Sequence, residues 1–344
     1  MRFTIPPLLA ALGLLSLPLA LKLPLSASTE LEEVHQLLGT HLPALGTNDL
    51  ASTSVDDLVT RLTPRVRWVT ATVDPAESGE VILATRRFPG DNGYVRLGHV
   101  TGDVASRLNE AVETLAMDRA LRGLVIDLRF AEGRDFAASA QASALFFPSG
   151  TPVLDWGDGA FTAPEKTNRF SGPLALLVNS ATRGSAEALA ASLRHAGLAV
   201  VIGGTTAGEA TLTRDFVLTS GRSLRLAVAP VKAGDGTPIA PDGLVPDIQV
   251  SATAESERRF LADPFAAATP ASAPTGDLGA STQVKRRLTE AELIRSKRQA
   301  LGQPDPATAD PDPKPPAPAD ANRVQDPVLA RGLDLLTGLN AVRE

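Results

Sequence analysis

The chain has 344 residues, of which 43% are hydrophobic, so it can bury a large core and has room for two domains. Its formal net charge is −6 without a basic block, which argues against nucleic-acid binding and against a basic membrane-binding patch. The chain has no cysteine, and its four histidines lack metal-ligand spacing, so we expect neither thiolate chemistry nor a metal site.

Residues 1–28 are predicted to be a signal peptide or a membrane anchor. Arg2 precedes an apolar run at residues 3–21, and small residues follow before the sequence turns polar. A signal peptide would be cleaved after Ala27 or Ser28. The run also approaches the ~20 residues that span a bilayer, which keeps an uncleaved anchor open. Either alternative predicts an exported protein of the periplasm or cell envelope.

The hydrophobic pattern of the next 220 or so residues predicts an N-terminal helical region followed by an α/β core. Residues 29–79 are taken as the helical region, with two short helices within 30–62. The predicted core, 80–252, alternates strands and helices, and its apolar run at 123–128 is typical of a strand buried on both faces. The predicted strands are 80–85, 94–100, 123–128, 151–155, 173–178 and 199–203. The predicted helices of this core are 105–120, 136–147 and 186–195.

Residues 253–344 differ in composition from the core. The segments 262–279 and 304–318 are rich in Ala and Pro and are predicted to be flexible connectors. Helical patterns at 288–300 and 327–342 predict two helices in this tail. Because short helices need tertiary contacts to persist, we expect these two to dock on the core or on a partner.

The turn at 179–185 carries the residue types of an acyl-transfer site. It joins the predicted strand 173–178 to the predicted helix 186–195, and it contains Ser185. The N–H groups that open a helix lie at its positive end, where an anion or an oxyanion is stabilised. The turn therefore has the geometry of a site, which alone does not establish an activity.

Several motifs in this order resemble the tail-specific, or C-terminal processing, serine proteases. They include Asp127-Leu128-Arg129 at a strand end, the turn glycine Gly133, and the closing PDGLVPDIQV segment. The resemblance covers about half of the chain and implies a crotonase/ClpP-like core, serine-type peptide-bond hydrolysis, and a peptide or protein substrate. The family's usual PDZ insert has no room here, because only about thirty residues separate the N-terminal helices from the core strand at 94–100.

The matched positions of the family's Ser/Lys dyad hold other residues in this chain. The family's nucleophilic Ser stands three residues before a Glu that matches Glu187, which places Gly184 at the nucleophile position. The family's Lys follows a glycine that matches Gly208, which places Glu209 at the base position. A Ser hydroxyl needs a neighbouring base, and a carboxylate beside a forming oxyanion adds repulsion. The resemblance therefore implies family membership with an impaired dyad.

The neighbouring residues leave alternatives open. A shifted turn would present Ser185 as the nucleophile, whereas Ser near a helix start is more often a cap or a first-turn residue. Gly133 is predicted to let backbone N–H groups approach a ligand carbonyl, so Gly133 and Ser185 are the candidate oxyanion and peptide contacts. Asp127 and Arg129 are predicted to form a structural pair. No cofactor is expected, since the Gly203-Gly204 pair lacks the Lys and Ser or Thr of a phosphate loop.

Three classes of function follow from these expectations. The chain is a serine peptidase that uses Ser185, or a non-catalytic module that binds peptides or a small ligand, or an envelope scaffold that recruits partners through its tail. We favour an exported tail-specific-protease-like protein with impaired or absent hydrolysis, since fold alone does not establish function. The sequence leaves the oligomeric state open.

Overall fold

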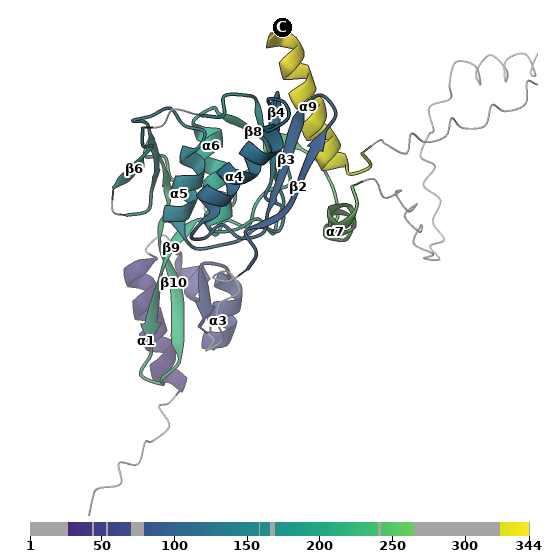
Figure 1. Cartoon of the computed structure of the whole chain (residues 1–344). Coiled ribbons are helices and arrows are strands. Elements are labelled where there is room, and N and C mark those ends of the chain that lie inside the picture. The colour runs from purple at the N-terminus through teal and green to yellow at the C-terminus, as the bar shows by residue number, and fades with distance from the viewer. Residues whose placement is uncertain are drawn as a thin grey trace, which may run out of the picture. The chain divides into compact units, whose positions relative to one another are not determined.

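The computed structural model describes residues 27–42, 45–52, 54–69, 79–157, 159–165, 169–239, 242–264 and 324–343. They fall into two compact units, one within Met1–Val73 and Thr211–Pro230 and the other within Asp74–Ala210 and Val231–Glu344 (Figure 1). Most of the predicted signal segment, namely residues 1–26, and the predicted helix at 288–300 lie outside the described residues. Among the residues described, no helix is long and apolar enough to cross a bilayer.

The first unit combines short helices with a three-stranded antiparallel sheet. Its helices are α1 (Ala27–His41), α2 (Thr47–Leu50) and α3 (Val55–Leu62), where two were predicted. Its strands are β1 (Val66–Trp68), β9 (Thr211–Val217) and β10 (Ser223–Pro230), in the order β1-β10-β9. The sequence prediction assigned 211–230 to the protease-like core. The hairpin lies instead in this unit because Leu224 and Leu226 share one buried cluster with Val34, Leu38 and Leu58.

The second unit is built on a six-stranded sheet with the order β12-β8-β7-β4-β3-β2. Its strands are β2 (Ile82–Phe88), β3 (Asn92–Leu97), β4 (Gly123–Asp127), β7 (Leu174–Val178), β8 (Ala199–Gly203) and β12 (Ile248–Gln249). All neighbours are parallel except β2, which pairs antiparallel with β3. β4 and β7 are buried along their whole length, as the continuous apolar runs predicted. The predicted α/β class is confirmed by this sheet.

Helices cover both faces of this sheet (Figure 1). α4 (Val104–Ala116), α5 (Phe136–Ala144) and α6 (Ser185–His195) pack beside one another on one face. α9 (Pro327–Arg343) covers β4, β7 and β8 on the other face, where Leu329 and Leu336 join the core cluster of Val125 and Leu177. A helix is therefore present where 327–342 was predicted, and it packs on the core, which is one of the two alternatives that the sequence left open. α4 and α5 end earlier than predicted, with Met117 and Leu145 at their C-caps.

Two further elements complete the second unit. A small sheet has the order β11-β5-β6 and consists of β5 (Pro152–Asp155), β6 (Ala160–Thr162) and β11 (Lys232–Ala233). α7 (Ala254–Ala262) was not predicted, because it lies beyond residue 252, where the predicted core ends. Its N-cap is Thr253, whose side chain accepts a hydrogen bond from the Ser256 N–H.

Candidate active site

The candidate site lies in the loops that follow β4, β7 and β8. Parallel strands place these loops at one edge of the sheet, which is the usual position of a site in an open α/β fold. The turn after β7 is tied to the loop after β4 by Thr182, whose Oγ1 donates to the Leu128 carbonyl at 2.8 Å. The Asn179 Oδ1 accepts from the N–H groups of Phe130 and Ala181, both at 3.1 Å. The two loops are therefore one hydrogen-bonded assembly.

Gly184 occupies the position at which the family resemblance places the nucleophilic serine. It is the N-cap of α6, with φ 61° and ψ −123°, a conformation that L side chains rarely adopt. A Cβ built on Gly184 would overlap the carbonyl oxygen of Gly133. The observed arrangement therefore leaves no room at this position for the serine side chain that the family resemblance implies.

Ser185 is fully buried, and both of its donors are engaged. Its Oγ donates to the Val100 carbonyl at 2.7 Å, and its N–H donates to the Gly133 carbonyl at 2.9 Å. The Arg183 N–H donates in the same way to the Ala131 carbonyl at 3.0 Å. Segment 131–133 thus lies along segment 183–185 as an extended peptide would, and it takes up the helix-start N–H that was predicted to stabilise an oxyanion.

Gly133 contacts the start of α6 through its carbonyl group. The sequence predicted that this glycine lets backbone N–H groups approach a ligand carbonyl; in the structure its carbonyl oxygen accepts from the Ser185 N–H. A side chain at Gly133 would overlap the Ser185 Oγ and the Val100 carbonyl. The glycine is therefore needed for close packing of three chain segments. The structure brings Gly133, Gly184 and Ser185 together, and in doing so it closes the space between them.

Glu209 lies at the position of the family's lysine and forms an ion pair. Its Oε1 is 3.7 Å from the Nη1 of Arg183, with 23% of the Glu209 side chain and 41% of the Arg183 side chain exposed. At this exposure the pair contributes about 0–1 kcal/mol. Position 209 therefore carries a carboxylate paired with arginine, where the family resemblance implies an amine.

Glu187 holds the loop that carries Glu209, a role that the sequence did not predict. The buried carboxylate accepts from the Thr206 hydroxyl and from the N–H groups of Gly208, Glu209 and Ala210, the last three at 3.0, 2.8 and 3.1 Å. Burial raises the pKa of this carboxyl, and the hydrogen bonds that it accepts act in the opposite direction. Glu187 thus fixes the backbone of residues 208–210.

A buried ionic network lies behind the two loops. Arg129 Nη2 lies 2.6 Å from an Asp127 oxygen, which confirms the predicted pair, and 2.7 Å from an oxygen of Asp326. The Oε1 of Glu257 is 4.0 Å from the same guanidinium, and its Oε2 accepts from Asn179 Nδ2 at 2.8 Å. The sequence could not indicate Asp326 and Glu257, because they come from distant segments that precede α9 and form part of α7. Among the described residues, no group of three or more acidic or histidine side chains is arranged to hold a metal ion.

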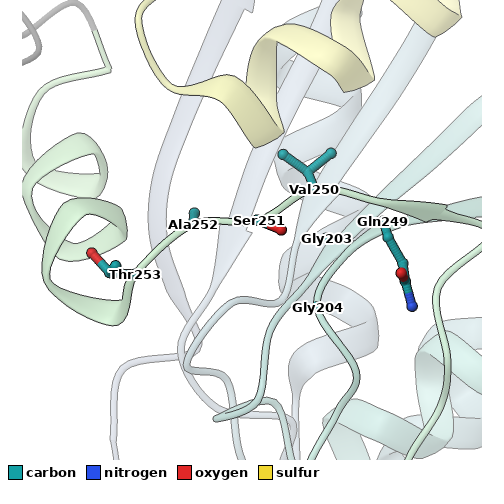
Figure 2. A pocket seen from close by; sticks show the side chains of 7 residues that line it. All are labelled: Gly203, Gly204, Gln249, Val250, Ser251, Ala252 and Thr253. Atoms are coloured by element: carbon teal, nitrogen blue, oxygen red, sulfur yellow. The ribbon is translucent and has the colours of Figure 1, made fainter. Parts of the chain in front are cut away.

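A shallow cavity of about 400 Å³ borders the site beyond the ends of β8 and β12. Gly203 and Gly204 form one wall and residues 249–253 form the other, as Figure 2 shows. The Gly204 N–H donates to the Val178 carbonyl, so this wall continues into the turn after β7. None of the lining residues has an ionisable side chain, so the cavity holds no acid, base or charged nucleophile.

Comparison with known proteins identifies the second unit. The profile described as peptidase family S41 matches residues 91–250. Carboxyl-terminal-processing peptidase 2, chloroplastic, from Arabidopsis thaliana is 28% identical over 205 residues, which are 56% of this chain and 40% of that protein. The carboxy-terminal processing protease CtpA of Bacillus subtilis is 25% identical over 204 residues, which are 58% of this chain and 42% of that protein. The chain spans about two fifths of the length of these two relatives.

A solved structure titled photosystem II D1 C-terminal processing protease shares 24% identity over 54% of this chain and 48% of its own, with a TM-score of 0.42. The profile covers β3, β4, β7, β8 and β12 together with all three loops of the candidate site. Residues 91–250, slightly less than half of the chain, therefore match peptidase family S41.

Proposed function

We propose that this chain is an exported S41-family protein that does not hydrolyse peptide bonds through the Ser/Lys dyad that the family resemblance implies. The observation that carries the proposal is the contact between Gly184 and Gly133. The nucleophile position has no side chain, and the carbonyl of Gly133 lies where a side chain would stand. Glu209 supplies a carboxylate at the base position, and that carboxylate is paired with Arg183.

Ser185 does not restore the missing nucleophile in this arrangement. A serine nucleophile gives its proton to a base and points toward an open substrate site. The Ser185 hydroxyl instead donates to the Val100 carbonyl, which cannot accept the proton as a base, and the side chain is buried. One residue along a helix also corresponds to about 100° of rotation, so Ser185 points away from the direction of residue 184.

The function that fits these observations is recognition of a peptide or protein partner without cleavage. The family is one of serine-type peptidases, and its fold is suited to polypeptide ligands, while export follows from the predicted signal segment. A peptide would reach the backbone of Gly133 and Ser185 only after segment 131–133 had moved away from segment 183–185. A scaffold role for the C-terminal tail stays open as the alternative.

A fluorophosphonate probe tests whether any serine in the chain is activated. We expect no adduct in the intact mass of the purified protein after prolonged incubation with the probe. The matched control is Ser185→Ala, which should give the same spectrum as the wild type. An adduct that peptide mapping places on Ser185, and that is lost in Ser185→Ala, would overturn the proposal.

A further inference from the structure

α7 contacts two of the three loops of the candidate site through two consecutive residues. The Glu257 carboxylate accepts from Asn179 Nδ2 in the turn after β7, at 2.8 Å. The Arg258 guanidinium lies over the ring of Phe130 in the loop after β4, 4.8 Å from its centroid. A single short helix therefore holds the loops that follow two different strands.

Asn179 transmits the contact with Glu257 to both loops. Its Nδ2 donates to Glu257, which fixes the orientation of the amide, so that Oδ1 faces the Phe130 and Ala181 N–H groups and accepts from both. Without Glu257 the Nδ2 group would lose its acceptor, and only the bonds accepted by Oδ1 would orient the amide. One carboxylate on α7 thus supports hydrogen bonds in two loops.

Phe130 shows that the loop after β4 is held against its own preference. Its φ is 62°, a left-handed conformation that is unfavourable for a residue with a bulky side chain. Such a conformation persists only where surrounding contacts fix it. The Asn179 hydrogen bond and the Arg258 contact are two of these contacts. Backbone hydrogen bonds also tie Glu132 to Gly98 and Val100, next to the point where segment 131–133 meets segment 183–185.

We infer that α7 is a clasp: Glu257 and Arg258 hold the loops after β4 and β7 in the closed arrangement, and displacement of α7 releases both loops together. Segment 131–133 then leaves segment 183–185 and exposes the start of α6. The clasp is also tied to the residue before α9, because Arg129 lies 4.0 Å from Glu257 and 2.7 Å from Asp326. The inference is independent of whether the site hydrolyses peptides, since it concerns access to the site.

A single thiol at residue 185 measures the opening. The chain has no cysteine, so Ser185→Cys introduces one reporter at a fully buried position. Its rate of modification by 5,5′-dithiobis(2-nitrobenzoic acid) is compared in the parent and in clasp variants. We expect modification about tenfold faster or more in Glu257→Ala, because a hydrogen bond to a charged acceptor is lost, and also in Arg258→Ala.

Two control variants distinguish loss of the α7 contacts from a general loss of stability. Glu255→Ala changes an exposed carboxylate on the same helix and should leave the modification rate within about twofold of the parent. Glu257→Gln keeps an oxygen acceptor for Asn179 and should restore most of the protection. Arg258 is exposed, so its alanine variant keeps the test valid even if Glu257→Ala fails to fold. Equal rates in the parent, Glu257→Ala and Arg258→Ala would overturn the inference, as would equal acceleration in Glu255→Ala.

Discussion

Replacement of Gly184 by alanine should destabilise the protein far more than the same change at Gly197. The two glycines flank the same helix, α6, and both have positive φ, 61° at Gly184 and 66° at Gly197. A Cβ at Gly197 would meet nothing within 4 Å, whereas a Cβ at Gly184 would lie closer than 3.0 Å to the Gly133 carbonyl oxygen. The pair therefore compares positive-φ strain alone, at Gly197, with strain plus steric overlap at Gly184, whose ψ of −123° also lies outside the left-handed helical region.

The expected magnitudes follow from these two terms. Left-handed strain for an L residue costs about 1–2 kcal/mol, and this is the whole effect expected for Gly197→Ala. Gly184→Ala adds the overlap with the Gly133 carbonyl, and overpacking of this kind costs about 1–3 kcal/mol more. The same overlap would affect a variant that restores both residues of the dyad. Gly184→Ser combined with Glu209→Lys should therefore be destabilised and should not gain hydrolysis.

Urea unfolding measured by tryptophan fluorescence checks this prediction. The chain has two tryptophans, and a Trp68→Phe background leaves Trp156 as the reporter of the second unit. The free energy of unfolding should fall by at least about 1 kcal/mol more in Gly184→Ala than in Gly197→Ala. Equal losses in the two variants would refute the reasoning, because they would show that the Gly133 carbonyl gives way to a side chain at residue 184.

Three further predictions concern the second unit. Arg129→Met should lower the free energy of unfolding by about 3–5 kcal/mol in urea or thermal unfolding, because it leaves buried carboxylates without their cation; a loss below about 1 kcal/mol would contradict this. Burial raises the pKa of Glu187, so the stability that this group contributes is present below the ordinary glutamate pKa and is lost as the pH rises through the raised value. The stability of the wild type relative to Glu187→Gln should therefore fall as the pH rises from about 4 to 7, and a flat difference would argue against a raised pKa. The Gln325 N–H donates to the Pro264 carbonyl at 2.8 Å, so the residues that flank 265–323 lie close together and a short linker can join them. Replacement of 265–323 by about six Gly and Ser residues should therefore change the Tm by less than about 3 °C. A larger fall would show that α9 needs that segment.

Continuous apolar runs made the central strands and the last helix predictable. β4 and β7 consist of apolar residues buried on both faces, and α9 has a helical pattern with Leu329 and Leu336 on its buried side. The hairpin at 211–230 was assigned to the other unit, because its partners in the N-terminal helices are more than 150 residues away in the sequence. Local pattern predicts elements, but it does not say which elements pack together.

The sequence predicted which loops carry the candidate site residues, but it did not predict how these loops pack against each other. The family motif placed Gly184 and Glu209, and both lie in the loops at the expected edge of the sheet. Which backbone group of Gly133 faces the start of α6 depends on the φ and ψ of this residue, which the sequence does not reveal because glycine adopts a wide range of both. The contacts of Glu257 and Asp326 with Arg129 depend on how the C-terminal segments pack on the core, and no residue spacing in the sequence predicts that packing.

Hydrolysis of an unfolded protein is the most direct test of the central claim. Purified wild-type protein and Ser185→Ala are incubated with reduced, unfolded β-casein, and the products are followed by mass spectrometry over a day, with an active S41 protease as the positive control. The absence of the dyad and the closed site predict no cleavage by the wild type above the Ser185→Ala background. Cleavage by the wild type that disappears in Ser185→Ala would contradict the account.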